Sequence, residues 1–252
     1  MPGIGPIPDE LSTWIALVMT IVARLSFVVF FMPGIGEQTI PAQMRLMILL
    51  ALAAMFSISG FMTPPPTDSF ASYAGVLASE VAIGFGLGVV MRVTIWMLTI
   101  AGSVISQSIG LSQLLGIALE HEQQTLTANL LSMAGAALLL SADFHIRAIA
   151  SLLRLYADVP IGGLEAMNQD MLVQAFLSAF GLAVMLAWPF VAVNLLYNIC
   201  LGFINKALPS LMVAFVGAPL MIGAGILLLT VSIMGILVVW EGRVPDLVVW
   251  LR

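Results

Sequence analysis

Three ionisable residues interrupt stretches that are otherwise apolar: Arg24, Glu80 and Arg92. A charge at the centre of a bilayer costs at least about 2.5 kcal/mol, so such a side chain usually faces protein or water. The three side chains therefore either line a polar pathway, form ion pairs between helices, or mark helix ends. Because Glu80 and Arg92 are twelve residues apart, more than about three turns of a straight helix, their partners are expected on other helices or other subunits.

One short segment resembles half of a zinc-protease helix, in which two histidines flank a glutamate at four-residue spacing. His121 and Glu122 match the start of that pattern, but the second histidine is replaced by Thr125, and His145 is the one other histidine in the chain. No Ser-His-Asp arrangement and no series of carboxylates through successive helices is visible. We therefore expect no catalytic residue, no metal site and no cofactor.

The segment 110–125 is polar and glycine-containing between apolar flanks. Irregular backbone is tolerated at membrane depth only where it is buried in protein or lines a water-filled cavity. The segment is thus either an external loop or a polar plug inside a channel. The candidate plug or gate residues are Gly110, Ser112, Gln113, Glu120, His121 and Glu122.

Small residues recur at four-residue spacing, which lets helix backbones approach closely in a membrane. This pattern predicts tight helix packing and not chemistry. The glycines near residue 84 do not form a nucleotide-binding loop, because Val89 stands where that pattern needs glycine and no strand precedes it. The pattern comprises Gly84 with Gly88, Gly102 with Ser106 and Gly110, and Ala183 with Ala187.

The elements that position these residues are long apolar helices. Hydrophobic residues form 61% of the chain and charged residues 8%, whereas a typical soluble domain has about 25% charged residues. Residues 46–67, 171–205 and 207–240 contain no charged side chain, and about 20 apolar residues cross the hydrocarbon layer. The chain is therefore a polytopic membrane protein. A net charge of -5 without a basic stripe argues against nucleic-acid binding.

The apolar segments are bounded by proline, glycine and charged residues. The segment 72–119 is predicted to form two helices, or one helix and a re-entrant hairpin. Pro189 predicts that 171–205 is kinked or split. The most polar stretch is 143–170, with a turn at 160–163. The other predicted segments are 11–32, 41–62, 125–142 and 213–240.

Several single residues carry smaller expectations. Cys200 excludes an internal disulfide and is expected to pack among apolar side chains. Trp240 and Trp250 suit an interfacial belt. The N-terminus has no basic leader, so the apolar segments themselves are expected to direct insertion. The basic residues do not alternate between loops, which indicates that some segments are not ordinary lipid-facing spans and only weakly favours a cytoplasmic C-terminus.

One stretch resembles a family signature. Residues 202–219 combine a glycine, a basic residue, a proline, a small apolar run, a phenylalanine, a glycine and a proline in an order that resembles the flagellar biosynthetic protein FliR family. Lys206 stands where that family usually has arginine, and Ser210 where it usually has glutamine. The matching residues are Asn205, Lys206, Pro209, Phe215, Gly217 and Pro219.

Other segments resemble the same family in order and spacing, so that the resemblance covers about residues 10–245. One departure is clear, because the segment after Ser112 lacks the Asp-Pro pair that the family often has. The segments look like the first hairpin, the central region and the hairpin after the plug, in that order: Arg24 with Pro33, Pro41 and Arg45; Glu80 with Gly84, Gly88, Gly102, Gln107 and Gly110; and His145 with Pro160 and Gly162.

The resemblance implies an all-α fold, with membrane-type helical hairpins packed in a right-handed helical export-gate assembly. It implies one domain over 1–252, with hairpins and a plug-like loop over about 10–125 and later hairpins over 126–252. The implied function is that of a non-enzymatic subunit of the flagellar type III protein export gate. The implied partners are FliP-like and FliQ-like subunits, FlhB-like and FlhA-like proteins, membrane lipid and exported unfolded flagellar proteins. The implied location is the bacterial inner membrane, at the flagellar basal body.

Three alternatives stay open. The related virulence export apparatus, the SctT branch, shares these motifs. A small-solute transporter would have broken helices in two similar halves; Pro189 and Pro219 give this weak support, but no half repeats are visible. A structural subunit could scaffold the gate without touching the exported protein.

Overall fold

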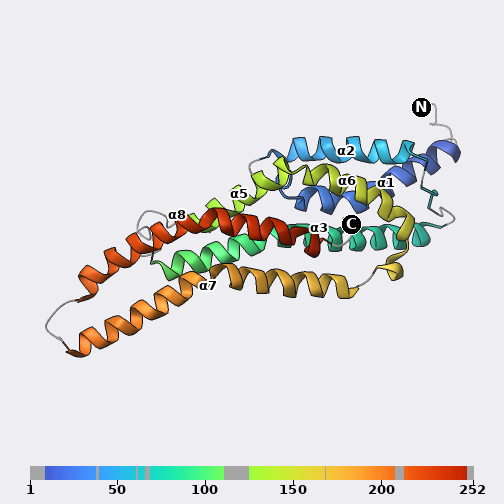
Figure 1. Cartoon of the computed structure of the whole chain (residues 1–252). Helices are drawn as coiled ribbons and strands as arrows, with labels where there is room; N and C mark the ends of the chain where they lie inside the picture. The colour runs from blue at the N-terminus through green and yellow to red at the C-terminus, as the bar shows by residue number, and fades with distance from the viewer. Residues whose placement is uncertain are drawn as a thin grey trace, which may run out of the picture. The chain divides into compact units, whose positions relative to one another are not determined.

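Every regular element in the described part of the chain is helical. The computed structural model describes residues 9–37, 40–60, 62–65, 69–110, 125–167, 169–207 and 213–248. This confirms the all-α class. In chain order (Figure 1) the elements are α1 (Asp9–Phe31), α2 (Ala42–Ile58), α3 (Phe70–Ser108), α5 (Leu126–Ser141), α6 (Phe144–Asp158), the 3-10 helix η1 (Leu164–Ala166), α7 (Gln169–Ala207) and α8 (Val213–Leu247).

Four described helices are long and apolar enough to cross a membrane: α1, α3, α7 and α8. The consecutive helices α5 and α6 add a fifth candidate if they are taken together as one span. Such a span would be broken, because the two helices bend by 66° at their junction. The bend lies at Asp143, whose φ of 56° is left-handed. These lengths confirm the membrane-type architecture expected from the apolar runs.

Two predicted splits are absent from the described part of the chain. The helix α3 is continuous over 39 residues, so the expected break within 72–119 is wrong for the described part of that segment. Glu80 and Arg92 lie inside α3 and do not mark helix ends. Each forms an ion pair with a residue from another part of the chain. The helix α7 continues through Pro189, so it is not split there. One proline removes one hydrogen bond, and the apolar residues on both sides continue the helix.

The helix α6 lies inside the stretch that the sequence interpretation treated only as polar. Its buried residues recur at four-residue spacing, at Phe144, Ala148, Leu152 and Tyr156. Arg147 and other polar side chains are exposed. The segment is thus an amphipathic helix, and its average polarity concealed one apolar face.

The contacts within the chain group into two compact units. The first unit, called unit 1, comprises residues 1–93, 139–176 and 247–252; the second, called unit 2, comprises 94–138 and 177–246. The helices α3, α5, α7 and α8 each contribute to both units. The expectation of a single domain over 1–252 stays a prediction.

In unit 1, α1 and α3 are in backbone contact. A side chain at Gly84 would collide with the carbonyl group of Arg24, and one at Gly88 would lie 2.6 Å from the carbonyl oxygen of Phe27. A close approach of this kind requires residues without a Cβ. The spacing of Gly84 and Gly88 therefore serves the packing of these two helices.

In unit 2, α3 and α5 approach in the same way. A Cβ at Gly102 would lie 2.6 Å from the Cα of Ala128. Trp240 of α8 is fully buried, and its Nε1–H donates to the carbonyl oxygen of Thr94 at 2.9 Å. The interfacial position predicted for Trp240 is therefore wrong, since the indole is a core group. Trp250 lies outside the described residues.

Cys200 also differs from its expectation. Its side chain is exposed on α7, although an apolar neighbourhood predicted a packed thiol. The neighbours of Cys200 are themselves exposed, including Leu196 at 63% and Phe203 at 71%. The apolar surface around Cys200 is thus not covered by the described part of the chain.

Candidate functional site

Two of the interrupting charges form an ion pair in unit 1. The guanidinium of Arg24, on α1, donates from Nε to Oε2 of Glu80 at 2.7 Å and from Nη2 to Oε1 at 2.8 Å. Glu80 lies on α3, and both side chains are 0% exposed. A bidentate arginine–carboxylate pair is strong and geometrically specific, so it fixes the position of α1 relative to the first part of α3.

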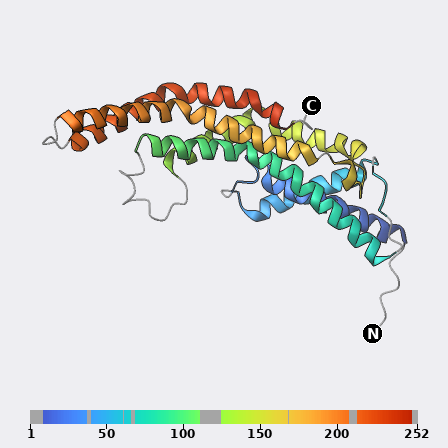
Figure 2. The ribbon, with the colours of Figure 1, turned by 90° about the horizontal axis from the view of Figure 1, so that it is seen from below.

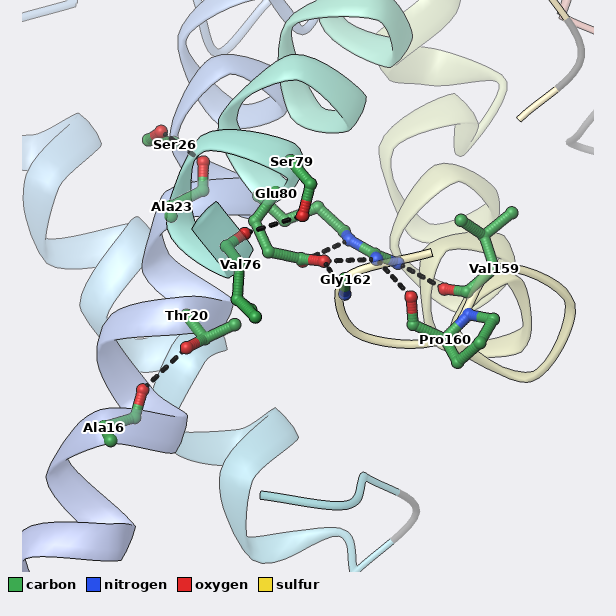
Figure 3. A network of polar contacts seen from close by, with 11 residues as sticks. Ala16, Thr20, Ala23, Ser26, Val76, Ser79, Glu80, Val159, Pro160 and Gly162 are labelled. Atoms are coloured by element: carbon green, nitrogen blue, oxygen red, sulfur yellow. Dashed lines mark hydrogen bonds and ion pairs between the residues drawn. The ribbon is translucent and has the colours of Figure 1, made fainter. Parts of the chain in front are cut away.

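The remaining hydrogen bonds of this pair are made by the turn that follows α6 (Figure 3). Arg24 donates to the carbonyl oxygens of Val159 at 2.9 Å and Pro160 at 3.3 Å. The backbone N–H of Gly162 donates to Oε1 of Glu80 at 2.9 Å. Gly162 has a φ of 81°, a conformation in which glycine is favoured. The predicted turn at 160–163 thus completes the coordination of both charges.

An aromatic side chain covers the guanidinium. The ring centroid of Tyr156 lies 4.1 Å from Cζ of Arg24, within the range of a cation–π contact. The same ring meets Phe56 of α2 edge-on, with centroids 6.2 Å apart. The hydroxyl of Tyr156 is buried and has no hydrogen-bond partner among the described residues. The network therefore joins α1, α2, α3 and α6 with the following turn.

A buried and fully coordinated pair of this kind has a structural role and is poorly suited to acid–base chemistry. Removing two charges from water is costly, and attraction within a pair offsets this cost only when the geometry is good and further hydrogen bonds are made. Arg24 and Glu80 meet both conditions. Neither side chain is exposed within the chain. Of the interpretations that the sequence allowed, which included a polar pathway and an interhelical ion pair, the geometry fits the ion pair.

The third interrupting charge has a different partner. Arg92 of α3 donates from Nη1 to Oε1 of Glu37 at 2.8 Å. Glu37 follows the end of α1, and the two side chains are 21% and 27% exposed. One ion pair therefore connects α3 to α1, and the other connects α3 to a residue that follows α1. The second pair is partly open to solvent.

The predicted plug segment lies almost entirely outside the described residues. Gly110, with a φ of 76°, follows the end of α3, and its backbone N–H donates to the carbonyl oxygen of Gln107 at 3.2 Å. Ser112, Gln113, Glu120, His121 and Glu122 are outside the described part. His145 is in α6, and its Nδ1 is buried without a hydrogen-bond partner among the described residues. Within that part no three potential ligands gather for a metal ion.

The signature residues belong to unit 2. Asn205 and Lys206 are exposed in the last turn of α7. Gly217, near the start of α8, faces the hydroxyl of Tyr197 and lies 3.4 Å from Leu201, measured from an ideal Cβ. Phe215 and Pro219 also lie in α8, whereas Pro209 is outside the described residues. The signature therefore includes a close contact between α7 and α8.

Sequence reasoning missed Glu37 and Tyr156, which complete the two ion-pair clusters. Glu37 is next to the predicted Pro-Gly turn, where a charged residue is unremarkable. Tyr156 belongs to α6, which was not predicted as a helix. Its position four residues after Leu152 and eight after Ala148 was the available signal, because this spacing defines one helix face.

Comparisons with known proteins agree with the resemblance carried by the signature. The profile of the family described as "Bacterial export proteins, family 1" matches residues 15–246. The "Flagellar biosynthetic protein FliR" of Caulobacter vibrioides is 33% identical over 89% of this chain and 91% of that protein. The proteins of the same name from Aquifex aeolicus and Escherichia coli are each 27% identical, over 92% and 88% of this chain and 90% and 85% of their own lengths. The chain belongs to the FliR family of bacterial export proteins.

Proposed function

We propose that this protein is a non-enzymatic subunit of the flagellar type III export gate in the bacterial inner membrane. In this role it assembles with FliP-like and FliQ-like subunits into a right-handed helical channel, close to FlhB-like and FlhA-like proteins. Unfolded flagellar proteins pass through the channel. Family membership over residues 15–246 supports the export function, and the three relatives named as flagellar proteins favour the flagellar system over the virulence branch.

The observation that carries the assembly is the uneven burial of the long helices. In the most apolar window of α3, 67% of the residues are buried by the chain itself; in α7 the share is 33% and in α8 it is 22%. Large side chains of α7 and α8 remain uncovered, including Trp188 at 61% and Val231 at 75% exposed. Such faces need lipid or other apolar chains. Partner helices meet this need where the segments leave the plane of the bilayer.

Within this proposal, the segment 110–125 is the plug and Lys206 with Pro209 shapes the connection between α7 and α8. The exposed Lys206 would then act in assembly and not in the stability of the isolated chain. The buried Arg24–Glu80 pair, by contrast, would fix the shape in which the subunit is presented to its partners. These roles make separate experimental predictions.

The main test is purification of the tagged protein from its own bacterium in mild detergent. We expect FliP-like and FliQ-like proteins to co-purify, and we expect a strain without this protein to secrete no flagellar subunits. Expression of the parent chain in that strain should restore secretion. A protein that is stable and solitary in native extracts, or a deletion strain that secretes normally, would contradict the proposal.

Lys206 offers a matched pair of variants. Lys206→Glu reverses an exposed charge and should reduce co-purification of partners while the protein level stays near that of the parent. Lys206→Arg restores the residue type usual in the family signature and should assemble normally. Normal recovery of partners with Lys206→Glu would contradict the assignment of Lys206 to the interface.

The plug has its own test. Shortening the segment 110–125 should let small ions leak through the assembled gate, measured as membrane conductance or loss of ion gradients in cells. The same deletion in cells lacking the FliP-like subunit is the control, because no channel should then form. Unchanged conductance in the complete system would argue against a plug.

A further inference from the structure

A line of asparagines runs along the C-terminal half of α7. Asn194, Asn198 and Asn205 lie in a segment of 35 residues without any charged side chain. At about 100° per residue, the three fall within an arc of about 40° on the helix surface. Asn194 is half-buried, whereas Asn198 and Asn205 are exposed. Apart from Lys206 in the last turn, the other exposed side chains of this half of α7 are apolar, so the asparagines form one polar stripe.

This stripe continues a face that the protein already uses for packing. In the preceding turns of α7, the same face carries Ala183, Ala187 and Phe190, each 1% exposed. Steps of three and four residues lead from these to Asn194 and Asn198, so one helix face passes from buried and apolar to open and polar. Figures 1 and 2 show the C-terminal part of α3 beside the middle of α7, and the α7–α8 hairpin continuing past the end of α3.

The helix α8 contacts a different side of this part of α7. Tyr197 and Leu201 of α7 lie next to Gly217 of α8. Tyr197 is about 100° around the helix from Asn198. Contact with α8 therefore leaves Asn198 exposed, although both helices belong to unit 2.

The hydrogen bonds of the stripe call for a polar partner. Nδ2 of Asn198 donates to the backbone oxygen of Asn194 at 2.8 Å and to its Oδ1 at 2.8 Å. An asparagine offers two donors and a carbonyl oxygen that accepts, so Oδ1 of Asn198 and Nδ2 of Asn194 remain available to a neighbour. Hydrocarbon provides no hydrogen-bonding group, and an amide left unpaired in it is costly.

A small residue beside the stripe favours a helix as the neighbour. Gly202 follows Asn198 by four residues, and an ideal Cβ built on it meets no atom within 4 Å. A glycine four residues from a polar residue allows a second helix to approach closely and exchange side-chain hydrogen bonds. Upstream on the same face, the small residues Ala183 and Ala187 are already buried, each 1% exposed.

We propose that Asn194, Asn198 and Asn205 form a docking face for a membrane-type α-helix of another export-gate subunit. The docked helix presents hydroxyl or amide side chains to the asparagines and packs closely at Gly202. This inference rests on the proposed function, because it assigns a particular face to one of the assembly contacts. The remaining apolar surface of α7 supplies area, and the asparagines supply register and partner choice.

The first test places a photo-crosslinking amino acid at position 198 in the full chain, in native membranes. We expect adducts with a helix of another gate subunit, identified by mass spectrometry. The same probe at Leu196, on the opposite side of α7, is the control and should not reach that helix. Adducts at position 198 only with lipid, only with the exported protein, or only within this chain would overturn the docking face.

The second test uses Asn194→Leu with Asn198→Leu. Leucine favours lipid exposure, so the protein level should not fall, but recovery of the partner per molecule of this chain should fall about threefold or more. Asn198→Gln, made alone, keeps an amide at this position and should recover more of the partner than the double leucine variant does. Parent-like recovery with the double leucine variant overturns the docking face alone. If the parent chain recovers no partner at all, the proposed function fails instead.

Discussion

Units 1 and 2 both contain close helix contacts at glycines, but they differ in their buried polar interactions. Unit 1 contains two ion pairs, Arg24–Glu80 and Arg92–Glu37, and the buried pair is completed by the turn at residues 159–162. Both of these pairs lie within unit 1. In unit 2, packing rests on small residues such as Gly102 and on the buried indole of Trp240.

The comparison distinguishes interactions that fix helices within a unit from surfaces that can receive other chains. Buried ionic groups specify one arrangement of the helices that carry them, because any other arrangement leaves a charge unpaired. Small residues allow close approach without dictating a single partner. The buried pair therefore fixes the helix arrangement within unit 1, and the exposed apolar faces of α7 and α8 in unit 2 are suited to receive other chains.

The largest expected effect comes from breaking the buried pair on one side only. Glu80→Ala leaves the guanidinium of Arg24 buried without its carboxylate, which should destabilise the protein by about 3–5 kcal/mol. We expect a large loss of folded protein in detergent, measured by thermal unfolding. Arg24→Met combined with Glu80→Leu removes both charges and is the control, since it should recover much of the stability. A single variant as stable as the parent would show that the pair does not hold unit 1 together.

The next effect concerns the contact of α1 with α3. Gly84→Ala forces a methyl group against the backbone of Arg24, and overpacking of this kind costs about 1–3 kcal/mol. Gly75→Ala is the matched control in the same helix, because a Cβ there meets no atom within 4 Å and alanine favours helix by up to about 1 kcal/mol. Equal unfolding temperatures for the two variants would contradict a backbone contact at Gly84.

A smaller effect is expected in unit 2. Trp240→Phe removes the hydrogen bond to the carbonyl oxygen of Thr94 and should cost about 1–2 kcal/mol. Trp188→Phe, at a side chain that is 61% exposed, should change the free energy of unfolding by less than about 0.5 kcal/mol. Denaturant unfolding of both variants checks the comparison, which fails if the exposed tryptophan matters more than the buried one.

The smallest effect belongs to the partly exposed ion pair. Arg92→Met should cost no more than about 1 kcal/mol, because solvent and salt screen exposed pairs. Glu37→Gln should have the same effect, and the two changes together should add little to either. Thermal unfolding at low and high salt measures this, and a loss as large as that of Glu80→Ala would mean that the two pairs are equivalent.

Much of the helix content could be predicted, because long apolar runs specify both helices and a lipid-like environment. The helices α1, α2 and α5 lie close to the predicted segments. The continuity of α3 could not be predicted from Glu80 and Arg92 alone, since the partners of these residues are 56 and 55 residues away in sequence. A distant partner turns a charge that resembles a helix end into an interior residue.

The candidate site was predictable only in part. Charges within apolar runs identified Arg24, Glu80 and Arg92 as unusual, but spacing could not choose between a polar pathway and an ion pair. The role of Tyr156 depends on α6, whose polar face masked the helix. The burial of Trp240 and the exposure of Cys200 depend on which face of each helix meets a neighbour, and an apolar run that is uniform around the helix carries no such information.

The members of the Arg24 network are far apart in sequence, so they are synthesised at different times. Arg24 enters with the first helix, Glu80 comes 56 residues later, and the carbonyl group of Pro160 comes 136 residues later. At ribosomal rates, the interval before the last of these groups emerges is on the order of ten seconds. During that time the first helix carries an arginine whose set of ligands is incomplete. A chain that ends before residue 160 lacks the carbonyl group of Pro160 and therefore cannot complete the buried network.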